Sequence, residues 1–289
     1  MKRAGLRSIG AACLLLLGFC GGMLLPGTLS AAPLLILADA SGSMREPVEV
    51  LRVDWEGPES DADPEEKLEV PKIAVVQKLL LRLTAVLPET DNPVAVYRLR
   101  YISGNPDRYA VFLPPEPREL SETTERLTED FILDYPTFNR RSAIGDALRQ
   151  FDERVLSGLE GPRKVILFSD GRETFYDLDR DREVWSEREA ADSAAAEEDE
   201  EMWGPLTETE RLRQAYGGDL TLVTVYVEPP PEKESEEESG GDAAEDPNEP
   251  PPGRRLLTDM SDANAGRFLD GLALLEDITP LTDALAGGK

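Results

Sequence analysis

Three polar side chains follow the first apolar segment of the chain at a spacing of two residues. Residues 34–38 (LLILA) lead directly into Asp39, Ser41 and Ser43 in the stretch DASGS. A continuous apolar run this short, with such flanks, is typical of a strand buried on both faces. A carboxylate and two hydroxyls grouped where that strand ends offer oxygen atoms, which are the ligands that hard cations such as Mg²⁺ prefer.

A second apolar segment also ends in a carboxylate, because residues 164–169 (KVILFS) precede Asp170. Ligands of open parallel sheets bind beyond the carboxyl ends of the strands, where the strand order reverses. If the two strands are neighbours, Asp39 and Asp170 meet at that edge, and Ser41 and Ser43 add hydroxyl oxygens. We expect a divalent cation there, with Mg²⁺ as the preferred ion and Mn²⁺ or Ca²⁺ as alternatives.

The elements that must position these residues alternate between strands and helices. After Pro71, apolar residues recur every three or four positions, which predicts a helix over 71–87. Residues 93–102 and 108–113 predict a hairpin. Further helices are expected over 119–131, 143–156, 254–266 and 279–285, two more within 183–216, and strands over 220–227 and 267–272. This alternation predicts an α/β fold with a doubly wound, mostly parallel central sheet, flanked by helices on both faces.

Three motifs together resemble those of the von Willebrand factor A (VWA) domain. Asp39-x-Ser41-x-Ser43 resembles the first element of the family's metal-ion-dependent adhesion site. Ser142 opens SAIGDAL at the place of the second element, where Thr is usual, and 169–171 (SDG) resembles the third. The elements stand in family order, and the resemblance extends over about 34–285, interrupted by insertions. It implies a Rossmann-like VWA fold.

The resemblance also implies roles for the site residues. Ser41, Ser43 and Ser142 would bind the ion directly, whereas Asp39 and Asp170 would act mainly through coordinated waters. A sixth position would be left for an Asp or Glu carboxylate of a partner protein. Ser142 keeps the hydroxyl of the usual Thr and lacks only its methyl group.

Composition restricts the function further. The formal net charge of −27 argues against nucleic-acid binding, because phosphates would be repelled. The chain has no histidine, which excludes a Ser-His-Asp triad and a His-ligated metal site. We therefore expect a non-enzymatic, metal-dependent protein-protein interaction module. Two alternatives stay open: an Mg-dependent phosphoryl-transfer or hydrolytic enzyme, and a scaffold domain with an unoccupied site.

Two insertions, at about 45–70 and 172–205, start directly after motif loops and should rise over the same edge of the sheet. The first is polar and is expected to be an inserted loop. The two insertions contain all three tryptophans, Trp55, Trp185 and Trp203. Tryptophan is enriched at binding hot spots, but the rings could instead pin the insertions onto their own domain, which we favour. Arg140 and Arg141, just before Ser142, suit an acidic partner or the acidic insertions equally well.

Two segments, one at the N-terminus and one inside the domain, differ in character from the rest of the chain. Basic residues, an apolar run over 9–25 and small residues predict that 1–32 is a secretory signal or an N-terminal anchor. Residues 33–289 would then form a VWA-like domain that is periplasmic or secreted, with a membrane link only through an uncleaved 1–32. The Pro- and Glu-rich segment at about 228–253 cannot bury enough apolar surface to fold and is expected to be a disordered acidic loop.

Overall fold

The computed structural model describes residues 33–57, 63, 65–87, 94–99, 107–116, 118–132, 142–173, 204–228 and 250–286. These residues belong to one compact unit, Ala31–Lys289. The segments 1–32, 174–203 and 229–249 lie outside the described residues. The predictions for the signal or anchor segment and for the acidic loop therefore stay predictions.

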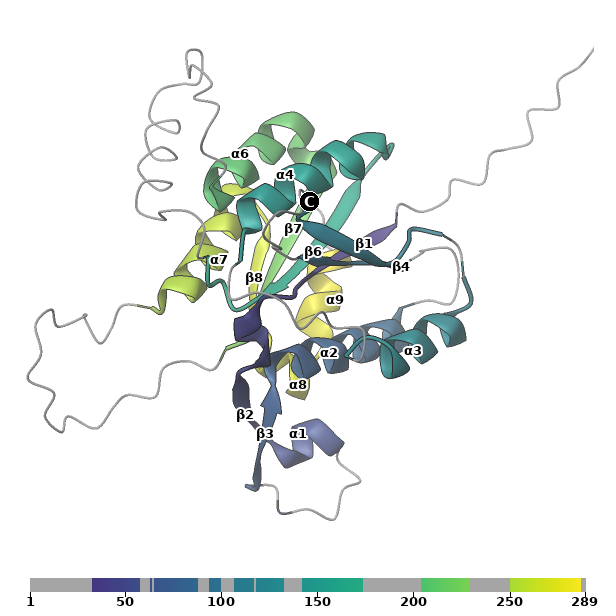
Figure 1. Cartoon of the computed structure of the whole chain (residues 1–289), viewed down its shortest axis with the longest axis vertical. Helices are drawn as coiled ribbons and strands as arrows, with labels where there is room; N and C mark the ends of the chain where they lie inside the picture. Colours follow the sequence, from purple (N-terminus) through teal and green to yellow (C-terminus); the bar gives the residue numbers. More distant parts are fainter. Residues whose placement is uncertain are drawn as a thin grey trace, which may run out of the picture. The chain divides into compact units, whose positions relative to one another are not determined.

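The core of the unit is a six-stranded sheet with the strand order β5-β4-β1-β6-β7-β8 (Figure 1). All neighbouring pairs are parallel except β4 and β5, which form the expected antiparallel pair. The strands are β1 (Leu34–Asp39), β4 (Val94–Leu99), β5 (Tyr109–Leu113), β6 (Arg163–Ser169), β7 (Leu220–Tyr226) and β8 (Arg267–Asp270). This arrangement confirms the doubly wound, mostly parallel α/β fold.

Helices cover both faces of this sheet and so bury the side chains of its central strands on both sides. Leu34, Ile36 and Ala38 of β1 pack into one core, and Leu35 and Leu37 pack into the other. The first core is closed by α2 (Lys72–Val86), α3 (Leu120–Glu129), α8 (Ala273–Glu276) and α9 (Thr279–Ala286), and the second by α4 (Ile144–Arg154), α6 (Pro205–Tyr216) and α7 (Pro252–Ala263). Of these helices, only the short α8 has no counterpart in the sequence prediction.

The chain leaves the sheet in opposite directions at its centre. The segment after β1 leads to α2 on one face, whereas the next described helix after β6 is α6 on the other face. Because β1 and β6 are parallel neighbours, their carboxyl ends lie side by side where these connections diverge. This is the position at which doubly wound sheets bind their ligands.

The first insertion is not the polar loop that the sequence suggested, and that interpretation is wrong. Strands β2 (Pro47–Leu51) and β3 (Lys67–Pro71) pair as an antiparallel hairpin, and the short helix α1 (Arg52–Glu56) follows β2. Val48, Val50 and Val70 are buried in the core on the α2 side, while the residues between them are largely exposed. Alternation over only five residues, set in a strongly polar stretch, hid the two strands.

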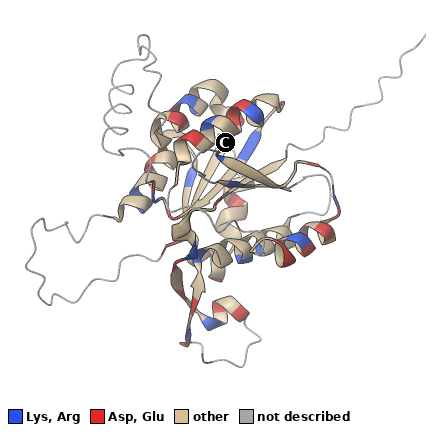
Figure 2. Ribbon diagram, in the orientation of Figure 1, with Lys and Arg blue, Asp and Glu red and all other residues tan. Residues whose placement is uncertain are grey.

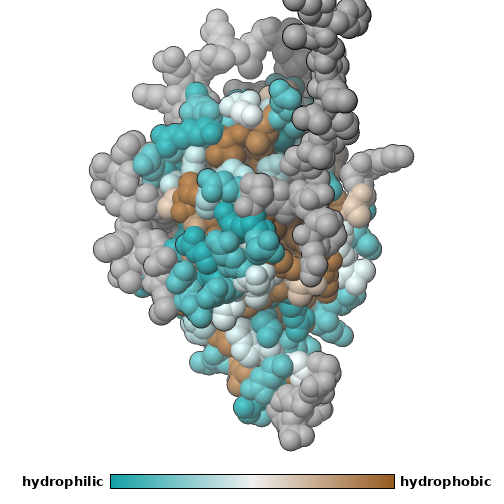
Figure 3. Space-filling model, turned by 90° about the vertical axis from the view of Figure 1, so that its right-hand side faces the viewer, coloured by the Kyte–Doolittle hydropathy of each residue, from teal (hydrophilic) through white to brown (hydrophobic). Residues whose placement is uncertain are grey.

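The surface of the described region is mixed in character. Acidic and basic residues intersperse along the helices, and most of the sheet is uncharged (Figure 2). In the side view, hydrophilic residues gather over the middle of the face and smaller hydrophobic areas lie between them (Figure 3). Of the helices in the described ranges, none combines the length and the apolar character that crossing a membrane requires.

Candidate functional site

Asp39 joins three segments of the chain at the carboxyl end of β1. Its Oδ1 atom accepts a hydrogen bond from the backbone N–H of Ser41 at 2.8 Å. Its Oδ2 atom accepts one from Ser169 Oγ at 2.7 Å and lies 3.5 Å from Ser142 Oγ. Only 1% of Asp39 is exposed. The carboxylate therefore joins β1 to the end of β6 and to Ser142, which lies two residues before the start of α4.

The hydroxyl groups of the first motif lie together. Ser41 Oγ and Ser43 Oγ are 3.0 Å apart, because the backbone from Gly42 to Arg45 turns as a short 3₁₀ helix. Ser41 is buried, whereas Ser43 is partly exposed. The period of two seen in the sequence thus belongs to a tight turn after the strand, and this turn points two hydroxyl oxygens at one place beside Asp39.

Asp170 is held by the turn that follows β6 and is fully buried. Its Oδ1 atom accepts the backbone N–H of Arg172 at 3.2 Å, and its Oδ2 atom lies 3.0 Å from the Nζ atom of Lys72. Gly171 has a φ of +67°, a left-handed conformation that favours glycine. Its N–H donates to Ser169 Oγ at 2.9 Å, so the same serine supports both Asp39 and this turn.

The start of α7 packs directly on the Asp170 turn. A Cβ atom on Gly253 would lie 2.1 Å from the carbonyl oxygen of Asp170, and one on Gly171 would lie 2.2 Å from the carbonyl oxygen of Gly253. Two glycines therefore allow the backbones to touch. This contact fixes the turn that carries Asp170 against the helix.

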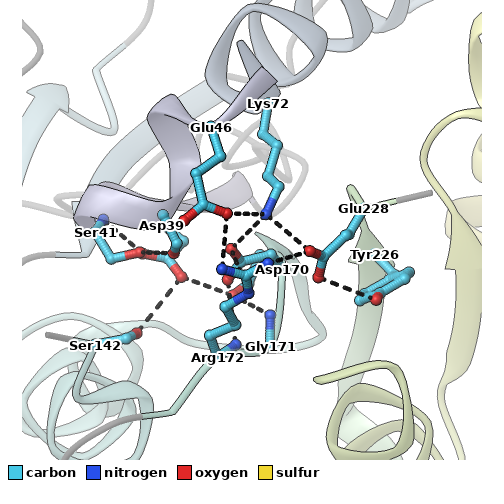
Figure 4. A network of polar contacts seen from close by, with 12 residues as sticks. Asp39, Ser41, Glu46, Lys72, Ser142, Asp170, Gly171, Arg172, Tyr226 and Glu228 are labelled. Atoms are coloured by element: carbon cyan, nitrogen blue, oxygen red, sulfur yellow. Dashed lines mark hydrogen bonds and ion pairs between the residues drawn. The ribbon is translucent and has the colours of Figure 1, made fainter. Parts of the chain in front are cut away.

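Charged side chains from four segments surround Asp170 (Figure 4). Besides Asp170, Lys72 Nζ contacts Glu46 at 3.3 Å and Glu228 at 3.2 Å. Arg172 also pairs with both of these glutamates. Lys72 is buried, whereas the side chains of Glu46 and Arg172 are close to half exposed, so they form the solvent-facing rim of the site.

The electrostatics of the site favour an additional cation. Within the described residues, the hydrogen-bond partners of the Asp39 carboxylate are neutral groups. Burial, and then the nearby charge of Asp170, raise the pKa of Asp39 to about 6. Among the described residues, the carboxylates of Asp39, Glu46, Asp170 and Glu228 outnumber the cations of Lys72 and Arg172 in this cluster.

The chemistry of the side chains fits a hard divalent ion. Asp39, Ser41, Ser43, Ser142 and Asp170 offer only carboxylate and hydroxyl oxygens, the donors that suit Mg²⁺. Within the described ranges, no group of three or more Asp, Glu, Cys or His side chains is placed to hold a metal. An ion here would therefore depend on the serine hydroxyls and on retained water, as the resemblance implies.

The predicted site residues thus divide into two groups. The structure brings Asp39, Ser41, Ser43, Ser142 and Asp170 to one edge of the sheet, although their role as ligands stays a prediction. Among the residues predicted to meet a partner, Arg140, Arg141, Trp185 and Trp203 lie outside the described residues.

Trp55 is described, and it lies on its own domain. It is partly buried against the core on the α2 side, and its ring centroid lies 5.8 Å from Lys78 Nζ of α2. This placement suits a residue that pins the insertion to the domain, the role favoured from the sequence. Whether Trp55 also contacts a partner stays a prediction.

The ionic network around Asp170 was not predicted from the sequence. Lys72 is the first residue of α2, whose first turn contains no acidic residue. The helix dipole disfavours a cation at that end of a helix. The position of Lys72 in the sequence therefore indicated, in principle, that carboxylates lie nearby. Glu46, Arg172 and Glu228 carried no such signal. Glu173 was also missed: its Oε2 atom accepts the N–H of Ile144 at 2.6 Å and caps the start of α4 beside Ser142.

Comparison with known proteins yields similar structures only. No protein-family model and no curated protein matches the chain. An aerotolerance-related membrane protein from Bacteroides fragilis is 12% identical, with a TM-score of 0.47, over 86% of this chain and 97% of that chain. BatB from Bacteroides thetaiotaomicron is 10% identical, with a TM-score of 0.44, over 87% and 99%.

A von Willebrand factor type A structure from Catenulispora acidiphila is 14% identical, with a TM-score of 0.43, over 87% of this chain and 41% of that chain. The chain's own strand order has the form expected of a VWA-like fold, with the three motifs at one edge of the sheet.

Proposed function

We propose that the chain is a non-enzymatic protein-interaction module that acts outside the cytoplasm. It binds a divalent cation, preferably Mg²⁺, at the carboxyl edge of its sheet. The observation that carries this proposal is the convergence of three separate motif segments. Asp39 Oδ2 lies within 3.5 Å of hydroxyls from both Ser142 and Ser169, which come from 103 and 130 residues further along the chain.

The residues that would hold the ion are Ser41, Ser43 and Ser142, with Asp39 and Asp170 close by. The ion would supply a positive centre that attracts an Asp or Glu carboxylate of a partner protein. The chain's own contribution is to hold the donors before the ion arrives, through the hydrogen bonds of Asp39 and the turn at Gly171. The partly exposed Ser43, Glu46 and Arg172 leave this position open to a second protein.

The proposed location outside the cytoplasm depends on the sequence of 1–32, which has the order of basic, apolar and small residues of a secretory signal or anchor. The first residue of β1 is Leu34, directly after this segment, and Asp39 is its last. The site would therefore lie at the end of β1 away from a membrane that anchored the N-terminus.

Calorimetric titration with Mg²⁺ tests the proposal. The wild-type chain should show saturable binding, and Ser142→Ala should weaken it by about tenfold or more, since a single good ligand contributes on the order of 1–2 kcal/mol. Ser157→Ala is the matched control, because within the described residues that exposed hydroxyl bonds to the carbonyl of Glu153. A wild-type chain that binds no Mg²⁺ would refute the ion dependence.

The partner is found by capture from an envelope extract on the immobilised chain, once with Mg²⁺ and once with a chelator. A protein that is retained only with Mg²⁺, and is lost with Ser142→Ala, has the behaviour of a ligand that completes the ion. A phosphatase assay with and without Mg²⁺ tests the enzymatic alternative on the same preparation; Mg-dependent turnover would favour that alternative.

A further inference from the structure

Lys72 places a positive charge in the site before any ion binds. Its side chain is only 2% exposed, and Nζ lies 3.0 Å from the Oδ2 atom of the fully buried Asp170. A buried ammonium is costly unless carboxylates surround it. Three carboxylates do so here, those of Asp170, Glu46 and Glu228.

This ammonium engages the carboxylate that a bound ion and its waters would also need. One oxygen of Asp170 faces Lys72, and the other accepts the backbone N–H of Arg172. Water bound to a cation donates hydrogen bonds to carboxylates, as an ammonium does. The ion's water and the lysine therefore compete for the same oxygen. The fixed positive charge also repels a divalent ion at close range.

The surroundings of Lys72 offer the ammonium a second place to bind. Glu46 and Glu228 both contact Nζ, and both lie toward the solvent-exposed rim of the site. If the bond to Asp170 broke, the ammonium could keep these two partners with a small movement. The backbone N–H of Lys72 also donates to the carbonyl of Glu46 at 3.1 Å, which holds the start of α2 beside this glutamate.

We infer that Lys72 is a built-in competitor of the divalent cation: its ammonium neutralises Asp170 in the ion-free protein and yields this carboxylate when the ion binds. This inference rests on the proposed function, because it concerns the affinity of that same site. It makes ion binding weak in the isolated chain. A partner carboxylate that completes the coordination of the ion would then shift the competition between the ion and Lys72. A partner cation that pairs with Glu46 or Glu228 would also shift it.

The experiment compares Mg²⁺ affinity, by calorimetric titration, in the full chain and in Lys72→Met. Removing the charge should raise the affinity by about tenfold or more. Lys72→Arg keeps the charge and should stay near the wild-type affinity. Lys78→Met is the matched control: it makes the same change on the same helix, but Lys78 lies against Trp55, and the affinity should not change.

A second measurement covers the case in which Lys72→Met does not fold alone, because three carboxylates lose the buried lysine and keep only Arg172 as a cation among the described residues. Circular dichroism then follows folding as Mg²⁺ is added. Recovery of the wild-type spectrum by Mg²⁺ supports the inference, since an ion replaces the ammonium. A variant that stays unfolded at saturating Mg²⁺ overturns it, because the lysine would then be purely structural.

The outcomes separate the inference from the proposed function. Equal or weaker Mg²⁺ affinity in Lys72→Met overturns the inference and leaves the proposed function standing. Binding by Lys72→Met but not by the wild type supports the inference and refutes ion-dependent binding by the natural chain, which would then be the scaffold alternative. Binding by neither protein overturns both.

Discussion

The ammonium of Lys72 lies 3.0 Å from the carboxylate of Asp170, although 98 residues separate them in the sequence. Both side chains are buried, one at the start of α2 and the other after β6. Their contact joins the two segments that leave the sheet in opposite directions. It makes the site at this edge an ionic cluster as well as a set of oxygen donors.

Asp170→Asn tests the structural part of this pair. We expect the free energy of unfolding in chelator to fall by about 2 kcal/mol, less than the loss for a fully orphaned buried charge, because Lys72 keeps Glu46 and Glu228. Urea unfolding measures the change. Glu49→Gln, which removes an exposed partner of Lys67, is the control and should cost under about 0.5 kcal/mol. A similarly small loss for Asp170→Asn would contradict the prediction.

Gly253→Ala tests the close packing of α7 on the Asp170 turn. The added methyl would meet the carbonyl oxygen of Asp170 at 2.1 Å, so one backbone must move. We expect a loss of about 1–3 kcal/mol in unfolding free energy, despite the better helix propensity of alanine. Gly158→Ala is the control, because among the described residues other than its chain neighbours no atom lies within 4 Å of that methyl. Equal stability of the two variants would show that the contact is not tight.

Glu173→Ala tests the cap on α4. The variant removes the carboxylate that accepts the N–H of Ile144 at 2.6 Å, where the helix dipole also favours a negative charge. Urea unfolding should show a loss of about 1–2 kcal/mol, and Glu173→Gln should lose less, because an amide oxygen still accepts the bond. Glu153→Gln, on the exposed last turn of the same helix, should leave stability nearly unchanged. An unchanged free energy of unfolding in Glu173→Ala would rule out the cap.

Glu208→Gln tests a buried charge away from the site, where α6 packs on α4. Burial raises the pKa of Glu208 above its ordinary value of 4.5 and outweighs the attraction of Arg211 and Arg149, while Asp152 raises it further. The folded protein therefore binds this proton more tightly than the unfolded chain does. The free energy of unfolding consequently falls as pH rises from about 4.5 through the raised pKa of Glu208.

The measurement is urea unfolding of both proteins between about pH 4 and pH 7. Glu208→Gln lacks the titrating group, so its stability relative to the wild type should increase as pH rises through that window. Glu210→Gln, which makes the same change on the same helix at a more exposed side chain, is the control. A stability difference between wild type and Glu208→Gln that stays constant, or shrinks with rising pH, would contradict the direction of the shift.

Local patterns in the sequence predicted most of the fold. The apolar runs that became β1, β6 and β7 were recognisable because strands buried on both faces are apolar along their whole length. The helix α2 was recognisable from its apolar spacing. Strands β2 and β3 were not, since each is five residues long and only their alternate residues are buried.

The same contrast holds for the site. Asp39, Ser41 and Ser43 form a local motif, and Ser142 and Asp170 each stand at the edge of a predictable element, so their meeting followed from the sheet. The ion pair of Lys72 with Asp170 depends on how α2 and the turn after β6 are packed in space. Nothing local in the sequence specifies that distance, although a lysine at a helix start was unusual.

The most direct test of the proposed site is calorimetric titration of Mg²⁺ into Asp39→Asn beside the wild type. Asparagine keeps the shape of the side chain and removes a charge that burial already disfavours, so the variant should stay folded in chelator, as circular dichroism would show. We predict saturable Mg²⁺ binding to the wild type and none to Asp39→Asn. Equal Mg²⁺ affinity in the two proteins would contradict the assignment of a cation site to this edge of the sheet.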